Sequence, residues 1–225
     1  KDLYYGEMAV RTDASSRFGK DHRWGMFWSL GLMWNIKNEP FLKDIEWLTG
    51  AQIALSTGTS GNSEIPYYDH LALVSGGPKY NDEAGIYPKQ SGNEELSWEQ
   101  TWSNNIGLRL GFFNRVNLDI DFYHKKTTDM LMSVPESYAI TGEGYRWDNI
   151  GAMVNRGVEV SVNSDIIRTK DFTWNLNANV SYNKNKLVEL YNGVQEYVNS
   201  TTGLKFVVGH PVHEYFLNRY AGVNP

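Results

Sequence analysis

The stretch that decides the fold is FTWNLNANVSY, residues 172–182. Every second side chain in it is apolar, from Phe172 to Tyr182, and the residues between them are Thr, Asn or Ser. Because successive side chains of an extended chain point to opposite faces, the stretch predicts a strand with one apolar and one polar face. At about 3.3 Å per residue, a strand of this length crosses a hydrocarbon layer when tilted. Aromatic residues at both ends of the apolar face are typical of a transmembrane β-barrel strand.

The same alternation returns along the chain. Residues 23–36, 98–112, 116–123 and 150–163 alternate clearly, and residues 3–14 and 48–57 alternate less regularly. We expect an all-β fold, part of an antiparallel up-and-down transmembrane barrel with about seven or eight strands in this chain. The residues predicted to face the membrane are Trp28, Leu30, Leu32, Trp34, Leu108, Leu110, Leu118, Ile120, Val158, Val160, Trp174, Leu176 and Val180.

The connections between these strands alternate in length. Three breaks are compact: those near residues 38–47, at 114–115 and at 168–170. The first of them is expected to contain a short helical turn at 41–47. Long polar stretches occupy residues 58–97, 133–147 and 188–203. An up-and-down barrel has short periplasmic turns and long extracellular loops. We therefore expect the whole of residues 1–225 to belong to one barrel domain, with its three long connections on the extracellular side.

Composition excludes several other classes. No apolar run approaches the roughly 20 residues of a membrane-spanning helix, and the net charge of −5 without a basic block argues against nucleic acid as a partner. Cysteine is absent, which excludes disulfides and cysteine-ligated metals. Soluble β-sandwiches have strands of about 5–6 residues, shorter than those expected here. The opening residues lack a signal peptide, so we expect a processed chain or a piece of a longer protein, and favour a piece.

Signals for catalysis or metal binding are weak. Asp119 and Asp121 share the inward face, where hydration or pairing with plug cations explains them better than an acid pair does. Residues 210–214 (HPVHE) lack the HExxH spacing of a zinc site, and Gly142–Glu143–Gly144 precedes no helix that would cradle a phosphate. We expect no catalytic residue, no cofactor and no metal, and hence no enzyme.

Four segments, in the same order along the chain, resemble the SusC/RagA family of TonB-dependent outer-membrane transporters. They are residues 17–25 (RFGKDHRWG), 93–99 (NEELSWE), 149–160 (NIGAMVNRGVEV) and 206–225, which contains VGHP and YAGVNP. The resemblance implies a barrel of about 22 strands around a plug, a TonB-contacting segment and a SusD-like surface lipoprotein that covers the barrel. Neither a plug nor a TonB-contacting segment is visible in this chain, so we expect TonB to act through a segment outside it.

The resemblance implies active import of oligosaccharides or peptides across the outer membrane of a Gram-negative, Bacteroidota-like bacterium. Outer-membrane lipid, TonB and the lipoprotein are the expected partners. A dimer of transporter–lipoprotein pairs is also compatible with the resemblance. The alternative is a secreted β-rich carbohydrate-binding or adhesion module without transport.

Aromatic residues in the long connections are the candidates for substrate contact. Their rings could stack on sugars or on peptide side chains, beside Asn, Asp and Glu that satisfy polar groups. The other interpretation, left open, is that these rings pack the loops together or contact the lipoprotein. The candidate substrate-binding residues are Tyr67, Tyr68, Tyr80, Tyr87, Tyr145 and Trp147.

Overall fold

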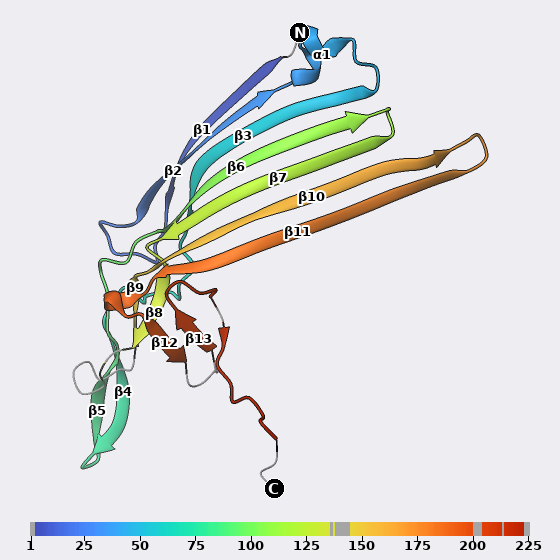
Figure 1. Cartoon of the computed structure of the whole chain (residues 1–225). Coiled ribbons are helices and arrows are strands. Elements are labelled where there is room, and N and C mark those ends of the chain that lie inside the picture. Colours follow the sequence, from blue (N-terminus) through green and yellow to red (C-terminus); the bar gives the residue numbers. More distant parts are fainter. Residues whose placement is uncertain (1–2, 136, 138–144, 200–203, 213, 223–225) are drawn as a thin grey trace.

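The structure is a computed structural model, and it describes residues 3–135, 137, 145–199, 204–212 and 214–222. One curved antiparallel sheet dominates it, and the long connections gather beyond one end of this sheet (Figure 1). Among the described residues, no helix has the length and apolar character needed to span a membrane.

Seven strands form the main sheet in the order β1-β2-β3-β6-β7-β10-β11, and each is antiparallel to its neighbours. They are β1 (Tyr4–Ala14), β2 (Trp24–Trp34), β3 (Leu48–Asn62), β6 (Glu99–Phe112), β7 (Val116–Thr128), β10 (Ala152–Arg168) and β11 (Thr173–Glu189). Their lengths of 11 to 17 residues exceed those of sandwich strands. The predicted antiparallel part of a barrel wall is confirmed.

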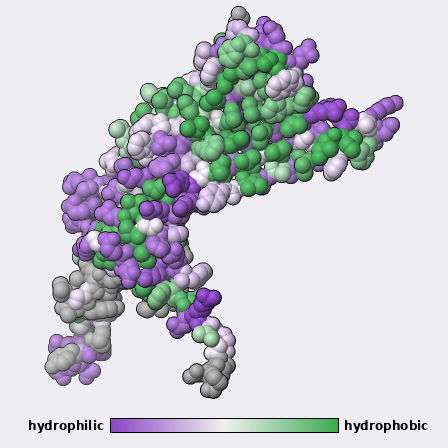
Figure 2. All heavy atoms as spheres, viewed as in Figure 1, coloured by the Kyte–Doolittle hydropathy of each residue, from purple (hydrophilic) through white to green (hydrophobic). Residues whose placement is uncertain are grey.

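The register aligns apolar side chains into continuous rows across one face of the sheet. One row consists of Leu32, Leu55, Ile106, Phe122, Val158 and Tyr182, and the next of Trp34, Ile53, Leu108, Ile120, Val160 and Val180. Figure 2 shows the resulting hydrophobic surface over the strands. The residues predicted to face the membrane all lie on this apolar face; that it meets lipid remains a prediction.

The opposite face of the sheet is polar and forms the inner side of the curved wall. Arg109, Asp119, Asp121 and Glu159 lie on it, together with a series of Asn and Ser residues. This division follows directly from the period-two alternation, because a one-residue shift of any strand would move its apolar side chains to the inner face.

Short connections lie at one end of the sheet and long ones at the other. Residues 113–115 and 169–172 link β6 to β7 and β10 to β11, and residues 35–47 carry η1 (Ile36–Asn38) and α1 (Pro40–Lys43), the predicted helical turn. Lys37 stabilises this last connection, because its Nζ donates hydrogen bonds to the carbonyls of Leu42, Lys43 and Ile45 at 2.8 to 3.1 Å.

The long connections contain more regular structure than the sequence predicts. β3 continues to Asn62, and within the stretch predicted as the loop 58–97 a hairpin forms from β4 (Leu73–Tyr80) and β5 (Glu83–Gln90). Gly76, Gly77 and the two prolines of this hairpin interrupt the alternation that would have revealed it.

Two further small sheets lie among the long connections. β8 (Leu131–Pro135) pairs with β9 (Tyr145–Asn149) inside the predicted loop 133–147, and β12 (Glu196–Asn199), β13 (Leu204–Val207) and β14 (Glu214–Tyr215) follow a single turn η2 (Tyr191–Gly193) after β11. Residues 136, 138–144 and 200–203 of the predicted loops lie outside the described residues.

The strand predicted from residue 150 begins instead at Ala152. Gly151 has φ +100°, a conformation that L-residues with a side chain rarely adopt, and it turns the chain into β10. β10 and β11 then continue beyond the predicted ends, to Arg168 and Glu189.

Candidate functional site

A small apolar core holds the long connections together. We call Phe18, Ile65 and Leu96 the loop core; their side chains are 0 to 3% exposed, and Trp98, Leu131 and Trp147 pack against them. Phe18 belongs to the β1–β2 connection, Ile65 and Leu96 to the β3–β6 connection, and Leu131 and Trp147 to the β7–β10 connection. Three connections therefore share one core.

Asn149 reinforces the loop core with its side-chain amide. Its Oδ1 accepts a hydrogen bond from the backbone N–H of Ser97 at 2.7 Å, and its Nδ2 donates to the carbonyls of Ser97 and Asp129 at 2.9 and 3.0 Å. Asn93 contributes in the same way, because its Nδ2 donates to the carbonyl of Trp147 at 3.1 Å. Both asparagines lie in the family-like segments, and their role in the structure is to fix one connection to another.

Two aromatic rings form a wall between the loop core and the inner face of the sheet. Trp98 contacts Phe18 and Phe27 edge to face, with ring centroids 5.5 and 5.3 Å apart, and its Nε1 donates to the carbonyl of Arg23 at 2.9 Å. Phe27 is buried and lies on the inner face of β2. Gly61 permits this packing, because a Cβ there would approach the Phe27 ring to 2.2 Å.

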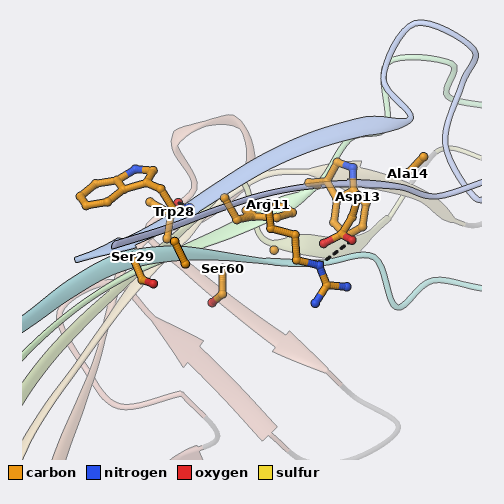
Figure 3. Close-up of a pocket in the computed structure, with 11 residues that line it drawn as sticks. Arg11, Asp13, Ala14, Trp28, Ser29 and Ser60 are labelled. Atoms are coloured by element: carbon orange, nitrogen blue, oxygen red, sulfur yellow. Dashed lines mark hydrogen bonds and ion pairs between the residues drawn. The ribbon is translucent and has the colours of Figure 1, made fainter. Parts of the chain in front are cut away.

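A pocket of about 600 Å³ opens beside this wall on the inner face of β1, β2 and β3. We call it the mouth pocket. In Figure 3, Arg11 and Asp13 are joined by an ion pair of 2.7 Å next to Ser29 and Ser60, and the Trp28 ring points away from that pair. An aromatic wall beside a charged pair and two hydroxyls can hold a ligand with apolar faces and many hydrogen-bonding groups.

A second polar hollow of about 530 Å³ lies farther along the inner face, across β6, β7, β10 and β11. Arg109 sits within it, with Nη2 3.3 Å from Asp121 Oδ1 and Nε 3.8 Å from Asp119 Oδ1. Arg109 of the neighbouring strand β6 is thus the cation that contacts both aspartates. The sequence alone predicted hydration or a cation from the plug at this position.

The predicted substrate-binding aromatic residues do not form one group. Tyr67 and Tyr68 lie together, with ring centroids 6.5 Å apart and 66% and 62% exposed, and the Arg17 guanidinium lies 4.7 Å from the Tyr67 ring centroid. Tyr87 lies on β5, in the separate hairpin. Trp147 is half-buried against the loop core, as the packing interpretation expects. The side chains of Tyr80 and Tyr145 lie outside the described residues.

Next to Tyr68, the Asp69 carboxyl is partly desolvated. This burial raises the pKa of Asp69, while the charges of His70 and Lys89 act in the opposite direction. At the other end of the chain, Nδ1 of His210 in the HPVHE segment lies 3.2 Å from Oε2 of Glu214. Residue 213 of this segment lies outside the described residues.

Sequence reasoning missed the residues of the mouth pocket. Arg11 and Asp13 share the inward phase of β1, but the weak alternation of that strand hid the signal. Phe27 alternates with the outward residues of β2, and an aromatic residue in this inward phase is a signal of inward packing. Trp98 opens the strand predicted over residues 98–112, but β6 begins at Glu99, so the alternation does not give the direction of the Trp98 ring.

Comparison with known proteins gives consistent matches. The family model described as TonB dependent receptor-like, beta-barrel matches residues 5–222. The TonB-dependent receptor SusC of Bacteroides thetaiotaomicron is 39% identical over 203 residues, covering 84% of this chain and 20% of the relative. The TonB-dependent receptor P39 of Formosa agariphila is 38% identical over 191 residues, covering 84% of this chain and 18% of the relative.

Among solved structures, the RagAB peptide importer in its closed-closed state matches with a TM-score of 0.88 at 38% identity. The match covers 93% of this chain and 23% of that chain. In its open-open state the same importer matches with a TM-score of 0.85. The chain thus spans about a fifth of the length of the curated relatives it matches.

Proposed function

The chain belongs to the TonB-dependent receptor β-barrel family, within its SusC/RagA group, and on this premise we propose that it is part of the wall of an outer-membrane nutrient importer. The importer takes up oligosaccharides or peptides, works with a SusD-like surface lipoprotein and is driven through TonB. It resides in the outer membrane of a Bacteroidota-type bacterium. It makes no covalent change to its cargo.

The observation that carries the proposal is the two-sided wall. From Phe172 to Tyr182, along the first half of β11, every second residue is apolar, and Trp174, Leu176 and Val180 lie on the outward face. Ten residues span about 33 Å along a strand, or about 25 Å along the membrane normal at a tilt near 40°. That height matches the apolar band of an outer-membrane barrel, and the inner face carries the charges expected of a water-filled or plugged lumen.

The mouth pocket supports the cargo class. Its aromatic wall and its Arg11–Asp13 pair fit either sugar rings with their hydroxyls or a peptide with its amides and side chains. Of the similar proteins, RagAB is described as a peptide importer. The proposal therefore includes both cargo types.

The secreted binding module is the weaker candidate. It requires short strands around a buried core, whereas Trp174 and Val180 of β11 are 50% and 70% exposed on the apolar face of a 17-residue strand. In water, such a surface would be a liability for aggregation.

The test is the extraction behaviour of the full-length parent protein. We expect it to leave the membrane fraction only with detergent, to show a heat-modifiable gel mobility, and to bring a surface lipoprotein that mass spectrometry identifies. A parent protein recovered from the aqueous fraction without detergent would overturn the proposal. If it is detergent-dependent but no lipoprotein accompanies it, the partner is wrong and the barrel stands.

A further inference from the structure

A group of cations lies on the outer face of the wall, where the apolar rows give way to the long connections. We call Lys126 of β7, Arg156 of β10, and Lys184 and Lys186 of β11 the outer cationic cluster; all four side chains are exposed. We propose that this cluster binds the phosphate of a lipid headgroup in the outer membrane. The inference rests on the proposed function, since it needs the apolar face to meet lipid.

The register fixes the position of the cluster relative to the apolar rows. Phe122, Val158 and Tyr182 are aligned across three neighbouring strands, and two residues farther along each strand the aligned residues are His124, Arg156 and Lys184. The following row contains Lys126, Val154 and Lys186. Because residues two apart share a face, the cations stand on the outward side and directly border the apolar surface.

The cluster lacks an internal counter-ion. Arg156 and Lys184 lie directly opposite each other on adjacent strands, an arrangement that like charges destabilise. In the described part of the chain, no ion pair joins any of the four cations to a carboxylate. An anion from outside the chain would relieve this repulsion.

The inner face of the same strands is different. There Arg109 is paired with Asp119 and Asp121, and Glu159 lies in the same hollow as Lys125. Cations and carboxylates are therefore mixed on the lumen side. On the outward side of these rows, every charged side chain is a cation. The unbalanced charge faces the membrane, which points to a lipid and not to cargo passing through the lumen.

Two outward hollows give the cluster the shape of an amphiphile site. One, of about 620 Å³, is lined by Arg156 and Lys184 together with Ile106, Phe122 and Val158. The other, of about 290 Å³, is lined by Arg156, Lys184 and Lys186 together with Val154 and Val208. No Asp or Glu is among the described residues that line either hollow. Phosphate oxygens can accept charge-assisted hydrogen bonds from the cations while acyl chains cover the apolar side chains.

The experiment uses the full-length transporter in detergent, and native mass spectrometry measures lipid retention. The probes are monophosphoryl lipid A, the same glycolipid without its phosphate, and inorganic phosphate. We expect the wild type to retain the phosphorylated lipid. The variant R156Q/K184Q/K186Q should retain it about a hundredfold less, because each cation near an anionic surface contributes about fivefold. The control K43Q/K125Q/K170Q removes three exposed cations outside the cluster, of which Lys125 lies on the opposite, inner face of β7, and should retain the lipid fully.

A second pair keeps the test decisive if the triple variant fails to fold. Lys126→Gln removes an outward cation and Lys125→Gln its inward neighbour on the same strand. Only the first should weaken lipid retention. Equal retention by both variants, equal binding of the dephosphorylated lipid, or displacement of the lipid by inorganic phosphate at the same concentration would each overturn the proposal. Detergent-dependent extraction should be unchanged in every variant, so loss of lipid binding is distinguishable from failure of the proposed function.

Discussion

At the scale of single residues, side chains of the family-like segments join one connection to another by hydrogen bonds and packing. Asn149 joins Ser97 and Asp129 through three hydrogen bonds, and Phe18 of the RFG segment is a member of the loop core. Next to it, Gly19 lies so close to Glu94 that an added Cβ would stand 2.1 Å from the Glu94 carbonyl oxygen. These residues hold the long connections in place but do not line the mouth pocket.

Replacing Asn149 by Asp keeps the shape of the side chain but removes its N–H donors. The carbonyls of Ser97 and Asp129 then face a carboxylate, and we expect the loop layer to lose about 1–3 kcal/mol of stability. The measurement is the protease sensitivity of the long connections in the full-length protein. Asn179→Asp, on the exposed inner face of β11, is the control and should leave that sensitivity unchanged. Equal effects of the two variants would contradict the role of Asn149.

Gly61→Ala tests the mouth pocket. Its Cβ would lie 2.2 Å from the Phe27 ring and 2.9 Å from Trp98, so the aromatic wall must shift into the pocket, at a cost of about 1–3 kcal/mol. We expect weaker cargo binding and slower uptake in the full-length transporter. Gly31→Ala is the matched control, since a Cβ there meets nothing within 4 Å. Uptake that is equally impaired in both variants would show that the effect is not specific to the pocket.

At the scale of strands, the period-two pattern was enough to predict the wall. Residues 172–182 alternate without interruption, so the sequence predicts which face of β11 is apolar. The register irregularities of the β10–β11 pair near Ala152 and Ile167 have no such signal. The hairpin β4–β5 could not be predicted, because glycine and proline remove the alternation where it forms. The mouth pocket was missed for another reason: its residues come from three strands and a loop, and their proximity is a product of tertiary packing.

Alternation predicts opposite outcomes for neighbouring substitutions on β10. Val160 lies in an apolar row and Ser161 on the inner face. Val160→Arg should destabilise the full-length barrel by about 2–4 kcal/mol, the cost of a cation near the middle of a lipid-facing surface, whereas Ser161→Arg should be nearly neutral. Urea-induced loss of the heat-modifiable band compares the two. Similar midpoints would mean that Val160 does not face lipid.

At the scale of the molecule, the described sheet is open. In the order β1-β2-β3-β6-β7-β10-β11, no described strand pairs with the outer edge of β1 or of β11. Hydrocarbon cannot satisfy unpaired backbone groups, so a spanning sheet must close. Further strands therefore have to complete the wall, in keeping with relatives about five times as long.

Residues 1–225 alone should therefore not form a stable membrane barrel. Refolded in detergent, they are expected to associate through the open edges of β1 and β11 into heterogeneous oligomers. Size-exclusion chromatography and gel mobility would report this, with the full-length parent as the control. A monodisperse, heat-modifiable monomer of residues 1–225 would contradict the open-edge interpretation.

The loop core also limits how this sector of the proposed importer can move. Phe18, Ile65 and Leu96, with Leu131 and Trp147 packed against them, join three connections into one unit beyond the end of the sheet. These connections cannot swing apart one by one without exposing that apolar core, so the aperture they border should stay constant through a transport cycle. Amide hydrogens around Asn149 should then exchange slowly whether or not cargo is present. Any gating motion of the proposed importer would have to occur in segments outside these three connections.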